Sequence, residues 1–354
     1  MKKIEANELS SEAKHSMLVR IITGICIALV CFPCIILGSW YFFLLILLVT
    51  ILSAFELTHV TDLKGSFKIV ISVITILLTV FIVVYVIFKN NIKNQTLEFD
   101  ENFFKTSDVL INGFNRIDIS VMLITLAAAI YFIISFFSPV FTVRHVFYYI
   151  TMIIVVAIGI QSLLFLRYSP FFYFSQKVDG VAIYGDLVSK DSFKYGQSMF
   201  LLFYVLIGVI MNDIGAYFIG VLFGKHKMNE KISPKKTWEG FLGGVVFSLI
   251  SSTLFAIIVT QCKKPMLPIF DFTKASNPYA VFFIIGISLF LPLIADTGDF
   301  IFSAVKRYWG VKDFSKLLPG HGGLLDRLDS MIFSAALVTC LIIFINLILN
   351  GQGV

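Results

Sequence analysis

Two pairs of aspartates in the C-terminal part of the sequence are spaced so that they could bind a metal ion. Asp296 and Asp299 are three residues apart, and so are Asp326 and Asp329. Residues at this spacing share one face of a helix, so each pair would present two carboxylates together. Clustered carboxylates repel one another unless a cation neutralises them, and carboxylate oxygens suit Mg²⁺. One or two Mg²⁺ ions would stabilise the charges of a displacement reaction at phosphorus.

The basic residues near these acids allow two interpretations. Lys306 lies seven residues after Asp299, on the same expected helical face, and Arg307 follows it. Arg327 comes directly after the first acid of the second pair. These cations could neutralise phosphate oxygens during a reaction, or they could only form ion pairs with the aspartates. Two acid pairs beside a glycine-rich turn favour the catalytic interpretation.

The turn between the two acid pairs has three glycines within four positions, Gly320, Gly322 and Gly323. Glycine tolerates a positive φ, so the backbone N–H groups of such a turn can converge on an anion. The helix expected to follow near Asp326 would point its N-terminus at the same place. His321, inside the turn, could bind phosphate, transfer a proton or only pack.

A second polar segment, residues 231–240, carries two adjacent lysines. Lys235 and Lys236 stand between the hydroxyl groups of Ser233 and Thr237. Lysines combined with hydroxyl groups suit the binding of a polyphosphate. The alternative is that these lysines only set the topology of a membrane protein by placing positive charge in the cytoplasm.

Asp213 interrupts the apolar stretch of residues 197–224. It lies about eleven residues from the expected cytoplasmic end of that stretch, or ~16 Å along a helix, close to mid-bilayer. A carboxylate at this depth costs about 2.5–3.5 kcal/mol. We therefore expect Asp213 to face the interior of the bundle and to contact substrate. The alternative is a structural aspartate that is protonated or paired with Asn212.

The composition indicates that lipid surrounds most of the chain. Of 354 residues, 58% are hydrophobic and only 14% are charged, whereas soluble domains have about 25% charged residues. The charge-free run of residues 21–55 is too long for one crossing of ~30 Å, so Gly38-Ser39 is expected to separate two helices. The sequence predicts an all-α, polytopic integral membrane bundle of about nine transmembrane helices. The expected spans are about 18–38, 40–58, 69–88, 119–143, 146–166, 197–224, 240–262, 275–295 and 330–349.

Basic residues set the expected orientation of these spans. With the N-terminus in the cytoplasm, 17 of the 28 Lys and Arg residues fall on the cytoplasmic side. The polar segments 225–239 and 304–328 then lie at the same membrane surface. We divide the chain into a cytoplasmic N-terminal segment (1–17), N-terminal transmembrane helices (18–190) and a catalytic transmembrane region (191–354).

Several of these residues form motifs that resemble those of a known enzyme family. Residues 303–307 (Ser-Ala-Val-Lys-Arg), Lys312-Asp313 and residues 319–329 (Pro-Gly-His-Gly-Gly-Leu-Leu-Asp-Arg-Leu-Asp) together resemble the C-terminal motif of the CDP-diacylglycerol synthases. These enzymes are also called phosphatidate cytidylyltransferases. Residues 212–217 and 233–240 look like the second hallmark of this family. The resemblance covers roughly residues 200–340.

The resemblance implies a polytopic enzyme that joins CTP to phosphatidic acid, giving CDP-diacylglycerol and pyrophosphate with the help of Mg²⁺. It implies metal-binding carboxylates at Asp299 and Asp326, with Asp329 alongside, and we add Asp296. The expected partners are CTP, phosphatidic acid and the lipid bilayer, without nucleic acid, and a homodimer is one expectation for its assembly. Catalytic roles are expected for Asp299, Lys306, Arg307, His321 and Asp326, and substrate contacts for Asp213, Ser233, Lys235, Lys236, Thr237, Lys312, Gly322, Gly323 and Arg327.

The mechanistic hypothesis is an in-line attack of a phosphatidate oxygen on the α-phosphorus of CTP. We expect the active site to face the cytoplasm, in a bacterial plasma membrane rather than the endoplasmic reticulum. Two other functions stay open from the residues alone. A CTP-dependent lipid kinase would transfer the γ-phosphate instead of CMP, and a polytopic transporter would use Asp213 inside the membrane.

Overall fold

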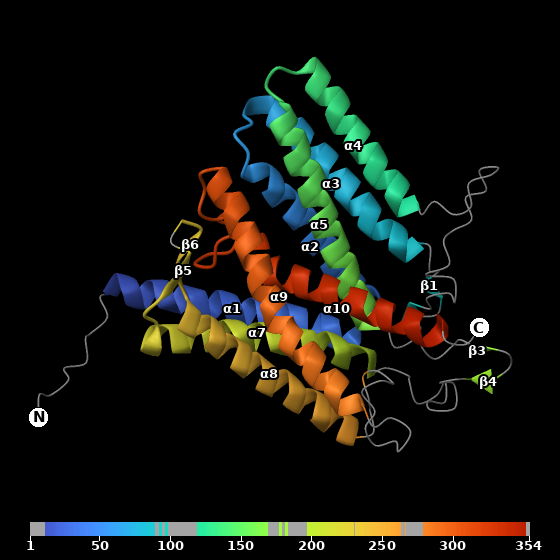
Figure 1. Ribbon diagram of the computed structural model, residues 1–354. Coiled ribbons are helices and arrows are strands. Elements are labelled where there is room, and N and C mark those ends of the chain that lie inside the picture. Colours follow the sequence, from blue (N-terminus) through green and yellow to red (C-terminus); the bar gives the residue numbers. More distant parts are fainter. Residues whose placement is uncertain are drawn as a thin grey trace, which may run out of the picture.

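The described residues form nine helices and three short hairpins (Figure 1). The computed structural model describes residues 11–88, 92–93, 96–97, 119–168, 177–178, 181–182, 197–229, 231–262, 266 and 279–351. The helices are α1 (Ser11–Leu37), α2 (Ser39–His59), α3 (Gly65–Phe88), α4 (Ile119–Phe137), α5 (Val143–Tyr168), α7 (Gln197–Phe223), α8 (Trp238–Gln261), α9 (Ala280–Tyr308) and α10 (Leu325–Gly351). The antiparallel hairpins are β1 (Ile92–Lys93) with β2 (Thr96–Leu97), β3 (Lys177–Val178) with β4 (Val181–Ala182), and β5 (Lys227–Asn229) with β6 (Ser233–Thr237).

Six of these helices, α2, α3, α5, α7, α8 and α9, are long and apolar enough to cross a membrane. Helices α1 and α4 contain shorter apolar segments, Ile22–Leu37 and Val121–Phe137. The predicted class, an integral membrane bundle of helices, is therefore confirmed. The predicted total of nine spans stays a prediction, and residues 1–10 of the expected cytoplasmic segment lie outside the described residues.

The predicted break at Gly38 is confirmed. Helix α1 ends at Leu37 and α2 begins at Ser39, and Gly38 between them has φ of 62°, which glycine adopts at little cost. The guanidinium of Arg167, near the end of α5, donates to the carbonyl oxygen of Ile35 at 2.8 Å. A cation that binds the last carbonyls of a helix stabilises its C-terminus, so α5 fixes the place where the chain turns.

Helix α9 extends further than the sequence predicted. The expected span ended at residue 295, and its first residues, 275–278, lie outside the described part of the chain. In the structure α9 continues to Tyr308, because the first left-handed residue is Gly310, with φ of 72°. Asp296 and Asp299 therefore lie inside a long helix and not at its end.

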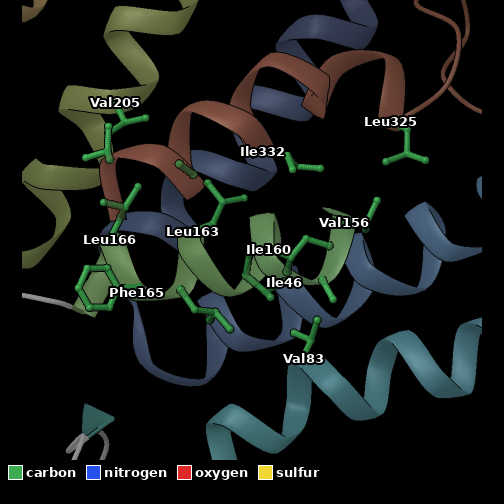
Figure 2. Close-up of a cluster of buried hydrophobic side chains, with 14 of the residues drawn as sticks. Ile46, Val83, Val156, Ile160, Leu163, Phe165, Leu166, Val205, Leu325 and Ile332 are labelled. Carbon is green, nitrogen blue, oxygen red and sulfur yellow. The ribbon is translucent and has the colours of Figure 1, made fainter. Parts of the chain in front are cut away.

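Helix α5 lies at the centre of the bundle. Its contacts with α10 are close, since a Cβ atom on Gly159 would lie 2.8 Å from Cβ of Ile332. Small residues allow helices in a membrane to approach in this way, where packing and not the hydrophobic effect holds them together. Figure 2 shows apolar side chains of α5 among those of α2, α3, α7 and α10, and the labelled residues are Ile46, Val83, Val156, Ile160, Leu163, Phe165, Leu166, Val205, Leu325 and Ile332.

Helices α7, α8 and α9 pack against one another, and α10 packs on α9 and α5. The β5–β6 hairpin and the loop after α9 lie next to each other at one end of α9 (Figure 1). The side chain of Arg307 joins them, because its Nη1 donates to Val311 O at 3.0 Å and its Nε to Ile232 O at 3.4 Å. The two polar segments that were expected to meet at one surface therefore do meet.

Candidate active site

Lys236, near the end of β6, bridges the two acids of α9. Its Nζ lies 2.6 Å from Asp296 Oδ1 and 2.7 Å from Asp299 Oδ2. Asn212 of α7 donates to Asp296 Oδ2 at 3.1 Å, and Ser303 donates to Asp299 Oδ1 at 3.3 Å. The prediction that this acid pair shares one helical face is confirmed, and a lysine from a separate element neutralises it.

The environment of Lys236 keeps its ammonium group charged. Burial alone would lower the pKa of Lys236, but the carboxylates of Asp299 and Asp296 outweigh this effect and raise the pKa above the usual lysine value. The same Nζ lies 4.7 Å from the ring centroid of Phe300, a favourable cation–π contact. Lys236 is therefore a fixed positive charge at neutral pH.

Two further carboxylates extend the acid pair Asp296 and Asp299 into an acidic cluster. Asp213 of α7 lies within electrostatic range of Lys236, Asp296 and Asp299. Asp329 of α10 is buried, with 5% of its surface exposed, and interacts with Asp299. Four carboxylates from three helices thus gather where Lys236 makes the direct ion pairs. Asp213 takes part in this cluster, but it is exposed, so the expectation that it faces the interior of the bundle is wrong.

The cluster carries a surplus of negative charge. Its four carboxylates lie within electrostatic range of three cations, Lys236, Lys306 and Arg327, and carboxylates gathered in a partly buried site favour a further cation. The Oδ1 atom of Asn212 is also buried without a hydrogen-bond partner among the described residues. Among the described residues, no group of three Asp, Glu, His or Cys side chains is arranged to hold a metal ion. The ammonium group of Lys236 lies between Asp296 and Asp299.

Asp326 anchors the loop that precedes α10, and its partner Lys306 lies within electrostatic range of Asp299 and Asp329. Its Oδ1 is 2.6 Å from Nζ of Lys306, and both side chains are buried. Its Oδ2 accepts the backbone N–H groups of Phe314 and Gly323, both at 2.9 Å. Both carboxylate oxygens of Asp326 therefore have partners in the protein, and its expected role as a metal ligand stays a prediction.

The glycine-rich turn has the predicted backbone but uses its N–H groups internally. Gly320 and Gly322 have φ of 74° and 91°. The N–H groups of His321 and Gly322 donate to Leu318 O, at 2.9 and 3.1 Å, and the N–H of Gly323 is bound by the Asp326 carboxylate. These three amides already have acceptors in the protein, Leu318 O and the Asp326 carboxylate, and their expected convergence on a substrate anion stays a prediction.

A pocket of about 420 Å³ opens at this turn instead. The guanidinium of Arg327 is fixed there by two hydrogen bonds to His321 O, at 3.1 Å from Nε and 2.6 Å from Nη2. The Nδ1 atom of His321 is buried and has no partner within the described residues. Arg327 also lies within electrostatic range of Asp213, an acid of the cluster. The residues that line the pocket are Lys312, Asp313, Gly320, His321, Gly322 and Arg327.

The remaining predicted site residues of the hairpin divide into two groups. Lys235 is exposed and Ser233 is partly exposed on β6, where both can meet a substrate. Thr237 is buried, and its Oγ1 accepts the N–H of Gly240 at 3.1 Å as the N-cap of α8. Thr237 therefore serves the fold in this structure, although the sequence suggested a substrate contact.

Glu56 of α2 is a buried acid that no motif in the sequence indicated. Its carboxylate is fully buried and accepts hydrogen bonds from the loop that carries the pocket. One signal was present in the sequence, because Glu56 is the first charged residue after the charge-free run of residues 21–55. A buried acid of this kind is a candidate functional residue.

The helical bundle and the clustered acids and cations define an integral membrane protein with a site suited to phosphate groups. Residues 18–345 match the cytidylyltransferase family, and the chain belongs to this family.

Individual relatives resemble the chain over shorter segments. A phosphatidate cytidylyltransferase of Bacillus subtilis strain 168 is 39% identical over 132 residues, which are 37% of this chain and 43% of that protein. One of Staphylococcus aureus strain COL is 39% identical over 147 residues, 42% of this chain and 50% of the relative. One of Mycobacterium bovis is 41% identical over 134 residues, 38% of either chain. The chain thus aligns with half or less of the length of these relatives.

Proposed function

We propose that the protein transfers CMP from CTP to phosphatidic acid, releasing pyrophosphate and leaving CDP-diacylglycerol in the membrane. The observation that carries the proposal is that Arg327 of a pocket with two cations lies within electrostatic range of the acidic cluster, inside a bundle of membrane helices. Membership of the cytidylyltransferase family and the names of the bacterial relatives support the same reaction. Both substrates are anionic and one is a lipid, which suits a charged site in such a bundle.

The pocket has the groups that a nucleoside triphosphate requires. Lys312 and Arg327 supply positive charge, and Arg327 is held in a fixed orientation by His321 O. His321 also lines the pocket, and an imidazole N–H can donate to a phosphate oxygen. We therefore assign the phosphates of CTP to this pocket, with Lys235 and Ser233 of the hairpin at the substrate entrance.

The reaction is an in-line displacement at phosphorus. A phosphatidate oxygen forms a bond to the α-phosphorus of CTP, and the bond from that phosphorus to the α,β-bridging oxygen breaks. Pyrophosphate leaves with the electron pair. No strong base is required, since a phosphate monoester is already largely ionised near neutral pH. The cations of Lys312 and Arg327 stabilise the negative charge that develops on the leaving group.

Mg²⁺ is part of the proposal. The acidic cluster would hold it through Asp213, Asp299 and Asp329, with Asp296 alongside, and a bound Mg²⁺ would supply positive charge to phosphate oxygens. The chain itself orients the cluster, because Asn212 and Ser303 hydrogen-bond two of its acids. We further propose that the site faces the cytoplasm of a bacterial cell, where CTP is made, in agreement with the distribution of Lys and Arg along the sequence.

The test is lipid product analysis with CTP labelled at either the α or the γ position. Purified protein receives phosphatidate in detergent micelles, CTP and Mg²⁺, with or without a chelator. Label from the α position in the lipid, lost on chelation, supports the proposal. Label from the γ position in the lipid identifies a lipid kinase, and solute uptake into proteoliposomes without a lipid product identifies a transporter. Either result contradicts the proposal.

A matched pair of variants tests the pocket assignment. Lys312 lines the pocket, whereas Lys316, four residues later in the same loop, is exposed outside it. Lys312→Ala should raise the KM for CTP roughly tenfold, the cost of about one charge-assisted hydrogen bond. Lys316→Ala should leave KM within twofold of wild type. Equal effects of the two substitutions would show that the pocket does not bind CTP.

A further inference from the structure

Glu56 connects the N-terminal helices to the loop that carries the pocket. It lies near the end of α2, and 0% of its surface is exposed. One carboxylate oxygen, Oε1, accepts Ser315 Oγ at 2.6 Å and the N–H of Leu324 at 2.7 Å. The other, Oε2, accepts the N–H of Leu325 at 2.7 Å. Every hydrogen bond described for this carboxylate therefore comes from residues 315–325, on either side of the glycine-rich turn.

These hydrogen bonds meet the first amides of α10. The N–H groups at a helix N-terminus have no partners within the helix, and an acceptor with negative charge satisfies them best. Glu56 supplies that acceptor from another helix, more than 260 residues earlier in the sequence. It thereby fixes the N-terminal end of α10, which carries Asp326 and Arg327.

A second carboxylate holds the same loop from the other side. Asp326 Oδ2 binds the N–H groups of Phe314 and Gly323. Gly323 lies between the two acids, and a Cβ atom there would be 2.8 Å from Glu56 Oε2 and 2.9 Å from Asp326 Oδ2. Only glycine permits this approach of two carboxylates to one backbone position. The loop is therefore clamped by Glu56 and Asp326, with the pocket residue His321 between the clamped ends.

We propose that Glu56 is a positioning residue of the reaction. It holds residues 315–325 so that His321 and Arg327 keep the geometry of the pocket, and this role rests on the proposed function of that pocket. The N-terminal helices thus contribute to the site as well as to the bundle. Helix α1 assists in the same way, since Thr23 donates to Pro319 O at 3.1 Å.

Glu56→Gln tests the proposal because the amide has nearly the same shape. Glutamine offers one acceptor oxygen and an NH₂ group, so at least one N–H of α10 would face a donor instead of an acceptor. Small displacements of positioning groups cost up to about a hundredfold in rate. We expect kcat to fall roughly ten- to a hundredfold. Hydrogen exchange should rise in peptides that cover residues 314–325 and stay at the wild-type level in the α5 core.

Two other variants provide the controls. Ser315→Ala removes one of the three hydrogen bonds and also the acceptor of the Leu317 N–H. Its effect on kcat should therefore add only in part to that of Glu56→Gln in the double variant, because the two share the Glu56–Ser315 contact. Ser53 lies one turn earlier on α2, is buried, and has no hydrogen-bond partner among the described residues. Ser53→Ala should leave both kcat and exchange of the loop unchanged.

The outcomes separate this inference from the proposed function. Unchanged exchange in residues 314–325, or faster exchange with kcat within twofold of wild type, overturns the positioning role. Faster exchange throughout the bundle also overturns it, since Glu56 would then support the whole fold. If the wild-type protein makes no CDP-diacylglycerol, the proposed function fails, and this inference fails with it even where the exchange pattern is as expected.

Discussion

The buried ion pair between Lys306 and Asp326 allows a sharp prediction about stability. Lys306 Nζ and Asp326 Oδ1 are 2.6 Å apart, and the two side chains are only 9% and 5% exposed. Methionine has nearly the length and volume of lysine but no charge. Lys306→Met therefore leaves the packing of α9 nearly intact and leaves the Asp326 carboxylate without its counter-ion.

The expected magnitude follows from the geometry. At 2.6 Å and an effective dielectric constant of about 20, the attraction between two unit charges is ~6 kcal/mol. Much of this offsets the cost of removing both groups from water. Loss of one partner leaves the other charge buried and unpaired, which typically costs about 3–5 kcal/mol. The two backbone N–H groups bound by Asp326 Oδ2 place the expected loss at the lower end of that range.

The measurement is the thermal unfolding midpoint of the purified protein in detergent. Lys306→Met should lower the midpoint by several degrees. The double variant Lys306→Met/Asp326→Asn should recover part of this loss, because the unpaired charge is gone while an acceptor oxygen still faces the loop amides. A loss below about 1 kcal/mol in the single variant, or no recovery in the double variant, would refute the reasoning.

Three further predictions concern the site and the fold. Asp299→Asn should reduce CDP-diacylglycerol formation at least a hundredfold with little change in the unfolding midpoint, and activity within a few-fold of wild type would contradict the metal assignment. Asp296→Asn should weaken the hold on Lys236, and it should raise the Mg²⁺ concentration needed for half-maximal activity; an unchanged Mg²⁺ titration would contradict a role in the cluster. Thr237→Val should lower the free energy of unfolding by about 1 kcal/mol, because α8 loses its N-cap, while kcat stays near wild type. A large fall in kcat without destabilisation would instead support the substrate contact that the sequence suggested.

Local patterns predicted the parts of the structure that depend on neighbours in sequence. The spacing of three between Asp296 and Asp299 was sufficient to place both on one face of α9, because helical geometry fixes that relation. The break at Gly38 followed in the same way from the length of the apolar run and the conformational freedom of glycine. Helix α9 ran past its predicted end, since hydropathy marks the apolar core of a span and not the end of the helix.

The partners of each charge could not be read from the sequence. The two acid pairs look alike, yet one is neutralised by Lys236 of the hairpin and the other is split, with Asp326 paired to Lys306 and Asp329 turned toward Asp299. The amides of the glycine-rich turn looked available to an anion. The structure gives them Leu318 O and the Asp326 carboxylate instead. Such choices depend on distances across the bundle that no local pattern encodes.

Hydropathy was sufficient to predict a helical membrane protein, and the motifs predicted that acids, lysines and a glycine-rich turn of the C-terminal half form one site. Hydropathy and helical periodicity are properties of short segments, so they can be identified from the sequence alone. The contact between Glu56, in the second helix, and the first amides of the last helix was visible only in the folded structure. A buried carboxylate accepts hydrogen bonds from whichever unpaired amides the packing places next to it. These amides become neighbours of the carboxylate only when the helices assemble.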